Sequence, residues 1–126
     1  MIRLQPLPIY REPAAHERKL MDLLVAPDFP GVEQIREQLR SCNVREIDDE
    51  GSLGLQIQSA VTASVITRVP VELYAPDMDG FDVHVLLHVV DGICQEIEIY
   101  KDAPGPIRKL PERWNYFVPS SGGSNP

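Results

Sequence analysis

The sequence predicts an α+β fold in which two N-terminal helices pack on one face of an antiparallel meander sheet of about five strands. Three observations lead to this prediction. Apolar residues recur with a helical period over roughly the first 40 residues, and they alternate with a period of two from Asn43 onward. The stretch from Phe81 to Lys101 then contains two alternating runs joined by Asp91-Gly92, which is a strong signal for a β-hairpin.

Length and composition indicate one ordinary domain. The chain has 126 residues, of which 43% are hydrophobic and 25% are charged, as in a typical globular protein. We expect a single α+β domain over residues 1–118 and a disordered tail over residues 119–126, which read PSSGGSNP. The N-terminus lacks the apolar core of a signal peptide and no stretch has the length of a membrane span, so we expect a cytoplasmic location.

Two helices are predicted in the N-terminal third of the chain. The first begins near Pro13, because proline is favoured at the first helical position. The second runs from about Pro30 to Arg40, and its polar residues include Gln38. The apolar stripes are Leu20, Leu23 and Leu24 in the first helix, and Val32, Ile35 and Leu39 in the second.

Three short strands are predicted between the helices and the hairpin. They cover residues 44–47, 53–58 and 68–75. Pro70 indicates an edge strand or the start of a strand, because proline donates no hydrogen bond to the ladder. Residues 59–64 fit either a loop or a strand continuation. The acidic segments that end in Gly51 and Gly80 read as turns, since neither has the spacing of a calcium loop.

The loop length of the hairpin decides which of its side chains share a face. With a two-residue loop, Val90 pairs with Ile93 and Leu87 faces Glu96, which buries a carboxylate among apolar side chains. With a three-residue loop, Val89 pairs with Ile93, and polar and apolar residues separate. We therefore predict the three-residue loop, with a glycine bulge.

This register predicts one apolar face and one polar face for the hairpin. His84 then lies opposite Glu98, and His88 lies opposite Cys94. The apolar face consists of Val83, Val85, Leu87, Val89, Ile93, Ile97 and Ile99.

The turn DMDG at residues 77–80 and the hairpin segments LHVVDG at 87–92 and EIEIYKD at 96–102 form a combined pattern. It resembles a family of small bacterial domains of unknown function that share an LHVxDG…ELEIYxDxG hairpin. The resemblance is close over residues 76–102 and looser over residues 20–110. It departs at residues 103–105, where the family continues with an acidic residue and a glycine. The resemblance supports the predicted fold and implies no activity.

The polar face carries the residue types that bind zinc, but their spacing argues against a shared ion. His84 and His88 are four residues apart on one strand, which separates them by about 13 Å. We therefore predict no metal site and no cofactor. Cys42 and Cys94 lack a C-x-x-C spacing, so we expect them to be small, buried or half-buried residues; reduced thiols are the simpler interpretation, and a disulfide between the two is the alternative.

Acid–base chemistry is the enzymatic alternative. Two glutamates and a histidine on one face are able to exchange protons, and the candidates are His84, Glu96 and Glu98. The sequence has no nucleophile motif, no phosphate-binding glycine loop and no H-E-x-x-H motif. The alternative is therefore a small hydrolase or metal-dependent enzyme, and it ranks below a binding function.

The favoured hypothesis is a non-enzymatic protein-binding module. The net charge of −7 argues against nucleic acid and anionic membranes, and it suits a basic protein partner, as for an immunity protein or inhibitor. Self-association through the same face is a related hypothesis, and so is coverage of this face by the C-terminal aromatic segment. The predicted binding residues are His84, Leu86, His88, Glu96, Glu98, Tyr100 and Trp114.

Overall fold

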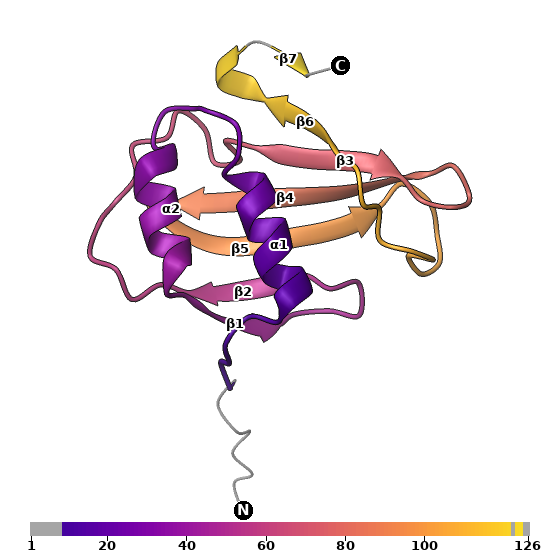
Figure 1. The fold of residues 1–126 in the computed structure, drawn as a ribbon, viewed down its shortest axis with the longest axis horizontal. Helices are drawn as coiled ribbons and strands as arrows, with labels where there is room; N and C mark the ends of the chain where they lie inside the picture. Colours follow the sequence, from indigo (N-terminus) through magenta and orange to yellow (C-terminus); the bar gives the residue numbers. More distant parts are fainter. Residues whose placement is uncertain (1–8, 122, 125–126) are drawn as a thin grey trace, which may run out of the picture.

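The computed structural model describes residues 9–121 and 123–124 (Figure 1). It confirms the α+β prediction, because helices α1 (Ala15–Leu24) and α2 (Val32–Arg40) both lie on one face of an antiparallel sheet. The strands are β1 (Asn43–Glu46), β2 (Leu53–Gln56), β3 (Glu72–Pro76), β4 (Asp82–Val90), β5 (Ile93–Lys101), β6 (Asn115–Val118) and the two-residue β7 (Gly123–Ser124). Neither helix of the described residues is long and apolar enough to cross a membrane.

The strands lie in the order β1-β2-β5-β4-β3-β6-β7 and every neighbouring pair is antiparallel. The long β4–β5 hairpin is therefore central, with the β1–β2 hairpin beside β5 and β3 beside β4. This order differs from a simple meander, since β2 pairs with β5 and not with β3. The prediction of about five strands missed β6, whose four residues form a strand by pairing with β3.

The core lies between the helices and the sheet. Buried residues alternate with half-buried ones along the whole of β4, which confirms the predicted period of two. Each fully buried aliphatic side chain stabilises the fold by roughly 1.5–3 kcal/mol. The buried residues at the centre of this layer are Leu20, Met21, Leu24, Val32, Ile35, Leu39, Leu73, Val83, Val85, Leu87, Val89, Ile97 and Ile99.

The predicted three-residue hairpin loop is wrong. Asp91 and Gly92 form a two-residue loop, and both have positive φ, 52° and 79°, as a type I′ turn requires. Val90 pairs with Ile93, but a register shift next to His88 inserts one extra residue into β5. Beyond the bulge, polar and apolar residues lie on opposite faces of the hairpin. The three-residue loop was predicted in order to achieve this same separation.

The bulge also exchanges two residues between the faces. Cys94 pairs with Val89 and is buried, with 1% of its surface exposed, whereas Ile93 is only half-buried. Ile93 therefore does not belong to the buried row in which it was predicted. Leu87 pairs with Ile97, so the rest of that row is as expected.

The segment before β3 shows how Pro70 is accommodated. The regular strand begins at Glu72, two residues after the proline. Before it, Leu87 donates a hydrogen bond to the Val71 carbonyl, and Val89 donates one to the Arg68 carbonyl. Pro70 therefore precedes the regular ladder, in agreement with the start-of-strand prediction, and residues 59–64 form a loop.

The C-terminal segment continues the sheet edge and does not fold over the sheet (Figure 1). Pro119–Ser121 form a short 3₁₀ helix, and β7 pairs with β6. Residues 122, 125 and 126 of the tail predicted at 119–126 lie outside the described residues.

Candidate functional site

The sheet face that points away from the two helices is the candidate site, and we call it the outer face. No helix or strand within residues 9–121 and 123–124 packs on it (Figure 1). The strand register places side chains from five strands, β1 and β3 to β6, on this face. They are Arg45, Glu72, Tyr74, Asp82, His84, Leu86, His88, Glu96, Glu98, Tyr100 and Phe117, with Arg68 and Asp102 at its ends.

His84 is held from four directions. Its Nδ1 lies 2.7 Å from Glu72 Oε2, and its Nε2 lies 2.9 Å from Asp102 Oδ2. Its ring stacks on the ring of Tyr100, with the two centroids 4.6 Å apart and the planes at 9°. The ring of Tyr74, on the neighbouring strand β3, has its centroid 6.4 Å from that of His84. Burial disfavours the charged ring, but the hydrogen bonds to the two carboxylates outweigh it and raise the pKa of His84.

His88 forms a second, separate centre on the outer face. The Arg68 Nε–H group donates to His88 Nδ1 at 3.0 Å, and His88 Nε2 lies 2.8 Å from Glu98 Oε1. Because Arg68 is only a donor, Nδ1 accepts and Nε2 carries the proton that is donated to Glu98. Glu96 lies opposite His88 in the ladder and completes this centre.

The predicted pairings of the two histidines are wrong, because the two-residue loop and the bulge each shift the register by one residue. His84 pairs with Tyr100 and not with Glu98, while His88 pairs with Glu96 and not with Cys94. The two glutamates of the enzymatic alternative therefore gather around His88, and His84 is bonded to other carboxylates.

The remaining predicted binding residues are divided between the two faces. Leu86 and Tyr100 lie on the outer face, beside the two histidine centres. Trp114 is packed against the buried core instead. Tyr116 pairs with the buried Leu73 and also packs against the core, so only Phe117 of the C-terminal aromatic residues joins the outer face, with 40% of its surface exposed.

Four residues of the outer face around the two histidines are missing from the predicted binding residues: Arg68, Glu72, Asp82 and Asp102. Glu72 and Asp102 bind His84 from a neighbouring strand and from the end of β5. Alternation in β3 places Glu72 on the face opposite to Leu73, but only the pairing of β3 with β4 brings it to His84. The alternation in the sequence thus indicates the face of the sheet on which such a residue lies, but the order of the strands is needed to show which histidine it reaches.

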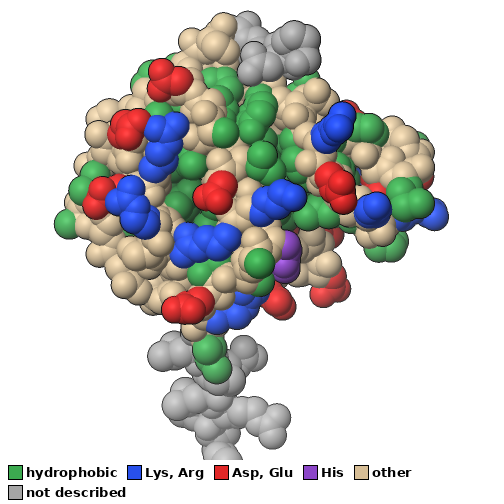
Figure 2. All heavy atoms as spheres, in the orientation of Figure 1, with side chains coloured by type: hydrophobic (Ala, Val, Ile, Leu, Met, Phe, Trp, Pro, Cys, Tyr) green, Lys and Arg blue, Asp and Glu red, His purple; other side chains and the backbone are tan. Residues whose placement is uncertain are grey.

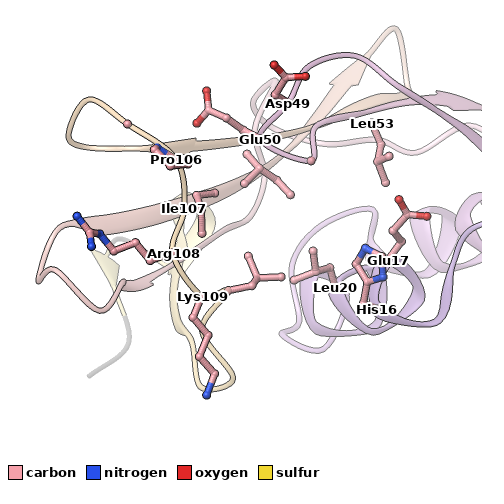
Figure 3. Close-up of a pocket in the computed structure, with 14 residues that line it drawn as sticks. His16, Glu17, Leu20, Asp49, Glu50, Leu53, Pro106, Ile107, Arg108 and Lys109 are labelled. Carbon is pink, nitrogen blue, oxygen red and sulfur yellow. The ribbon is translucent and has the colours of Figure 1, made fainter.

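A cavity of about 580 Å³ lies on the other side of the sheet, between α1, the β1–β2 turn and the segment after β5. Figure 3 shows Leu20, Leu53 and Ile107 inside it, while the charged ends of Arg108 and Lys109 point away. The acidic turn before Gly51 contributes to the rim. No residue of either histidine centre lines this cavity.

Comparison with protein families gives one match, to a family described as "Domain of unknown function (DUF6984)", over residues 10–111. The chain belongs to this family. The resemblance to a domain family of unknown function is therefore confirmed, and the DUF6984 region includes both helices, strands β1 to β5 and both histidine centres. Comparison with curated proteins and with solved structures found no match.

Proposed function

We propose that this DUF6984 domain is a non-enzymatic protein-binding module whose outer face docks on a basic protein partner. The observation that supports the proposal is the composition of the outer face. It carries five carboxylates, against two histidines and two guanidinium groups, that of Arg68 at its end and that of Arg45 on β1, which lies over Gly54. The five are Glu72, Asp82, Glu96, Glu98 and Asp102.

The helix side differs from the outer face in its charge pattern. Figure 2 shows Lys and Arg side chains beside Asp and Glu side chains on that side. Arg36 pairs with Glu33, and Arg40 pairs with Glu37. The helix side thus mixes cations with carboxylates, so the outer face is the better source of negative potential for a basic partner.

The outer face also has apolar groups that suit the centre of a protein interface. Leu86 lies between the two histidine centres, Tyr74 and Tyr100 flank His84, and Phe117 is well exposed. Aromatic side chains surrounded by charged groups are typical of interface anchors. A protein that masks a basic surface in this way acts as an inhibitor or immunity protein does.

The hydrolase alternative receives less support from the geometry. Its three residues are divided between two centres, and both nitrogens of each histidine already have hydrogen-bond partners. A general base needs a nitrogen that reaches the substrate proton.

A pair of charge-reversal variants with equal net charge tests the proposal. Glu96→Lys with Glu98→Lys alters the outer face, and Glu33→Lys with Glu37→Lys alters α2 by the same charge. Partners are captured with a photo-crosslinking residue at position 86, then purified and titrated. We expect a basic partner whose Kd rises by about tenfold or more only in the outer-face variant, with binding weakened by salt.

Two outcomes would overturn the proposal. One is a captured partner that binds both variants equally, or that is captured just as well when the photo-crosslinking residue is placed at position 33 of α2. The other is a second copy of this chain as the sole crosslinked species, with a dimer in sedimentation experiments.

A further inference from the structure

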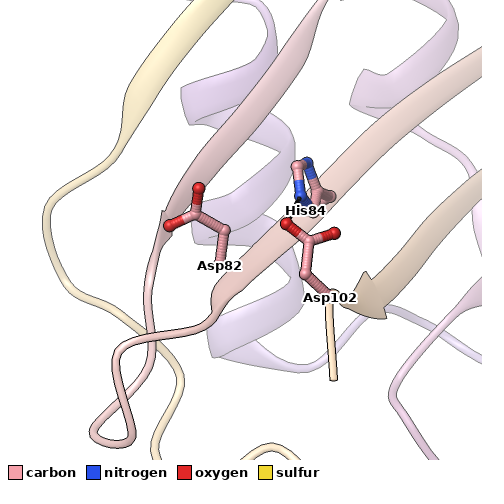
Figure 4. Close-up of side chains that lie close together, drawn as sticks. All are labelled: Asp82, His84 and Asp102. Carbon is pink, nitrogen blue, oxygen red and sulfur yellow. Dashed lines mark hydrogen bonds and ion pairs between the residues drawn. The ribbon is translucent and has the colours of Figure 1, made fainter. Parts of the chain in front are cut away.

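The geometry points to a binding site for a divalent first-row transition metal ion, such as Zn²⁺, formed by Asp82, His84 and Asp102. Their ligand atoms, one per residue, lie within 4.8 Å of one another. Figure 4 shows two of these residues on β4 and the third just after β5. The three residues lie on the outer face, but the inference rests on their ligand chemistry and does not depend on the proposed protein docking.

The ligand set matches the chemistry of such an ion. One imidazole nitrogen and two carboxylates suit Zn²⁺, whose ligand atoms lie about 2.0–2.2 Å from the metal and therefore roughly 3–4 Å from one another. His84 Nε2 and Asp102 Oδ2 are already 2.9 Å apart. A bound ion would replace the proton that joins them, with Asp82 as the third ligand. Three protein ligands leave at least one position for water.

The surroundings of His84 are those of a metal-binding histidine. In such sites the nitrogen that faces away from the metal donates to a carboxylate, which fixes the tautomer and the ring orientation. Glu72 Oε2 occupies this position, 2.7 Å from Nδ1, and Tyr100 fixes the ring plane by stacking. Glu72 is not one of the three ligands, so it is an independent observation in favour of the site.

The backbone also fixes the two aspartates relative to each other. The Asp102 N–H group donates to the Asp82 carbonyl at 2.9 Å, directly beyond the last ladder pair of the hairpin. The two carboxylates therefore start from adjacent strands at the same level. The spacing argument that excluded a metal at the sequence level concerned His84 and His88 together, and this site needs only His84.

The second group of possible ligands, His88, Glu96 and Glu98, provides an internal contrast. Metal binding at His88 Nε2 would place the proton on Nδ1. There it would face the Arg68 Nε–H group at 3.0 Å, so two donors would oppose each other. The hydrogen-bond pattern therefore selects the His84 group over the His88 group.

A calorimetric titration of tag-free protein with Zn²⁺ tests the site. We expect one ion per chain. Asp82→Asn and Asp102→Asn should each weaken binding by about tenfold or more, whereas Glu96→Gln in the other group should not. Asp82→Asn is the decisive variant, because the Asp82 side chain makes no hydrogen bond among the described residues and its loss should spare the fold.

Histidine NMR signals give a second measurement. Zn²⁺ should shift the ring resonances of His84 and leave those of His16 and His88 in place. Three results would overturn the inference: no saturable binding below about 1 mM, unchanged affinity in both aspartate variants, or equal loss in Glu96→Gln. Circular dichroism of each variant separates loss of the site from loss of the fold.

Discussion

The ammonium group of Lys101 lies 3.0 Å from Asp77 Oδ2, and the two side chains have 1% and 0% of their surfaces exposed. Asp77 also accepts hydrogen bonds from the backbone N–H groups of Arg108 and Lys109, at 2.7 and 3.0 Å. One carboxylate thus joins the β3–β4 turn to the end of β5 and to the segment that forms one wall of the apolar cavity. The turn predicted at this DMDG segment is confirmed, and its acidic residues bind Lys101.

Asp77→Asn should destabilise the protein and loosen the segment after β5. The amide keeps the size of the side chain but removes the charge opposite Lys101, and its NH₂ group faces donors where the carboxylate accepted. Thermal unfolding should show a clear fall in Tm, and hydrogen exchange should become faster at residues 108 and 109. Asp22→Asn on the exposed face of α1 is the matched control, and an equal Tm for both variants would contradict the argument.

The free energy of unfolding should fall at acidic pH. The backbone N–H of Arg108, followed by Lys101, holds the pKa of Asp77 far below its ordinary 3.8, although burial opposes this. Arg11 lowers the pKa of Glu17 from 4.5 in the same way. A carboxyl group with a lowered folded pKa stabilises the fold above its unfolded pKa, and this stability is lost as the pH falls through that value toward the folded pKa.

The window for this acid effect follows from the unfolded values. Stability should be level down to about pH 5 and then decline steadily toward pH 3, as measured by urea unfolding. Asp77→Asn should make the decline shallower, because one of the responsible groups is gone. A wild-type profile that is flat from pH 6 to pH 3 would show that these contacts do not act as argued.

Gln38 should be a larger contributor to stability than its place among the polar helix residues suggests. The structure buries it completely, which corrects its assignment to the polar face. Its Nε2 donates to the Val61 and Gly92 carbonyls at 2.9 and 2.8 Å, and its Oε1 accepts from the Cys94 N–H at 2.8 Å. Gln38→Met should cost about 2–3 kcal/mol, because it leaves the buried Cys94 N–H and two part-buried carbonyls without this partner.

Gln34→Met is the matched control for this prediction, since Gln34 lies on the same helix and is exposed. The free energy of unfolding of the Gln34→Met variant, measured in urea, should differ from that of the wild type by no more than about 0.5 kcal/mol. Equal effects of the two variants would mean that the buried amide does not connect α2 to the hairpin turn.

Both thiols should be unreactive in the folded protein. Burial raises the pKa of Cys94 to about 12 and also raises that of Cys42, so the thiolate is scarce at neutral pH. Both cysteines are free and buried in the structure, which agrees with the simpler of the two sequence interpretations. Ellman's reagent should modify neither thiol in native buffer and both in denaturant, and rapid modification of either in native buffer would contradict this.

The composition of the core was predictable because it depends on local periodicity. Alternation in β4 and the stripes of the two helices assign residues such as Val85, Leu87 and Ile35 to the core without knowledge of any partner. The position of the hairpin turn was predictable for the same reason, since Asp91-Gly92 is itself the signal. The length of the hairpin loop was not predictable from the sequence. A three-residue loop, and a two-residue loop followed by a bulge in β5, both place polar and apolar residues on opposite faces.

The chemistry of the outer face was decided only by the tertiary structure. The sequence by itself determined that His84 and His88 share a face, since they are an even number of residues apart on one strand. Their partners Glu72, Arg68 and Asp102 come from distant parts of the chain, 12, 20 and 18 residues away from the histidines that they bind. Strand order and register set these contacts, and both depend on the packing of the whole sheet rather than on the pattern within any one strand.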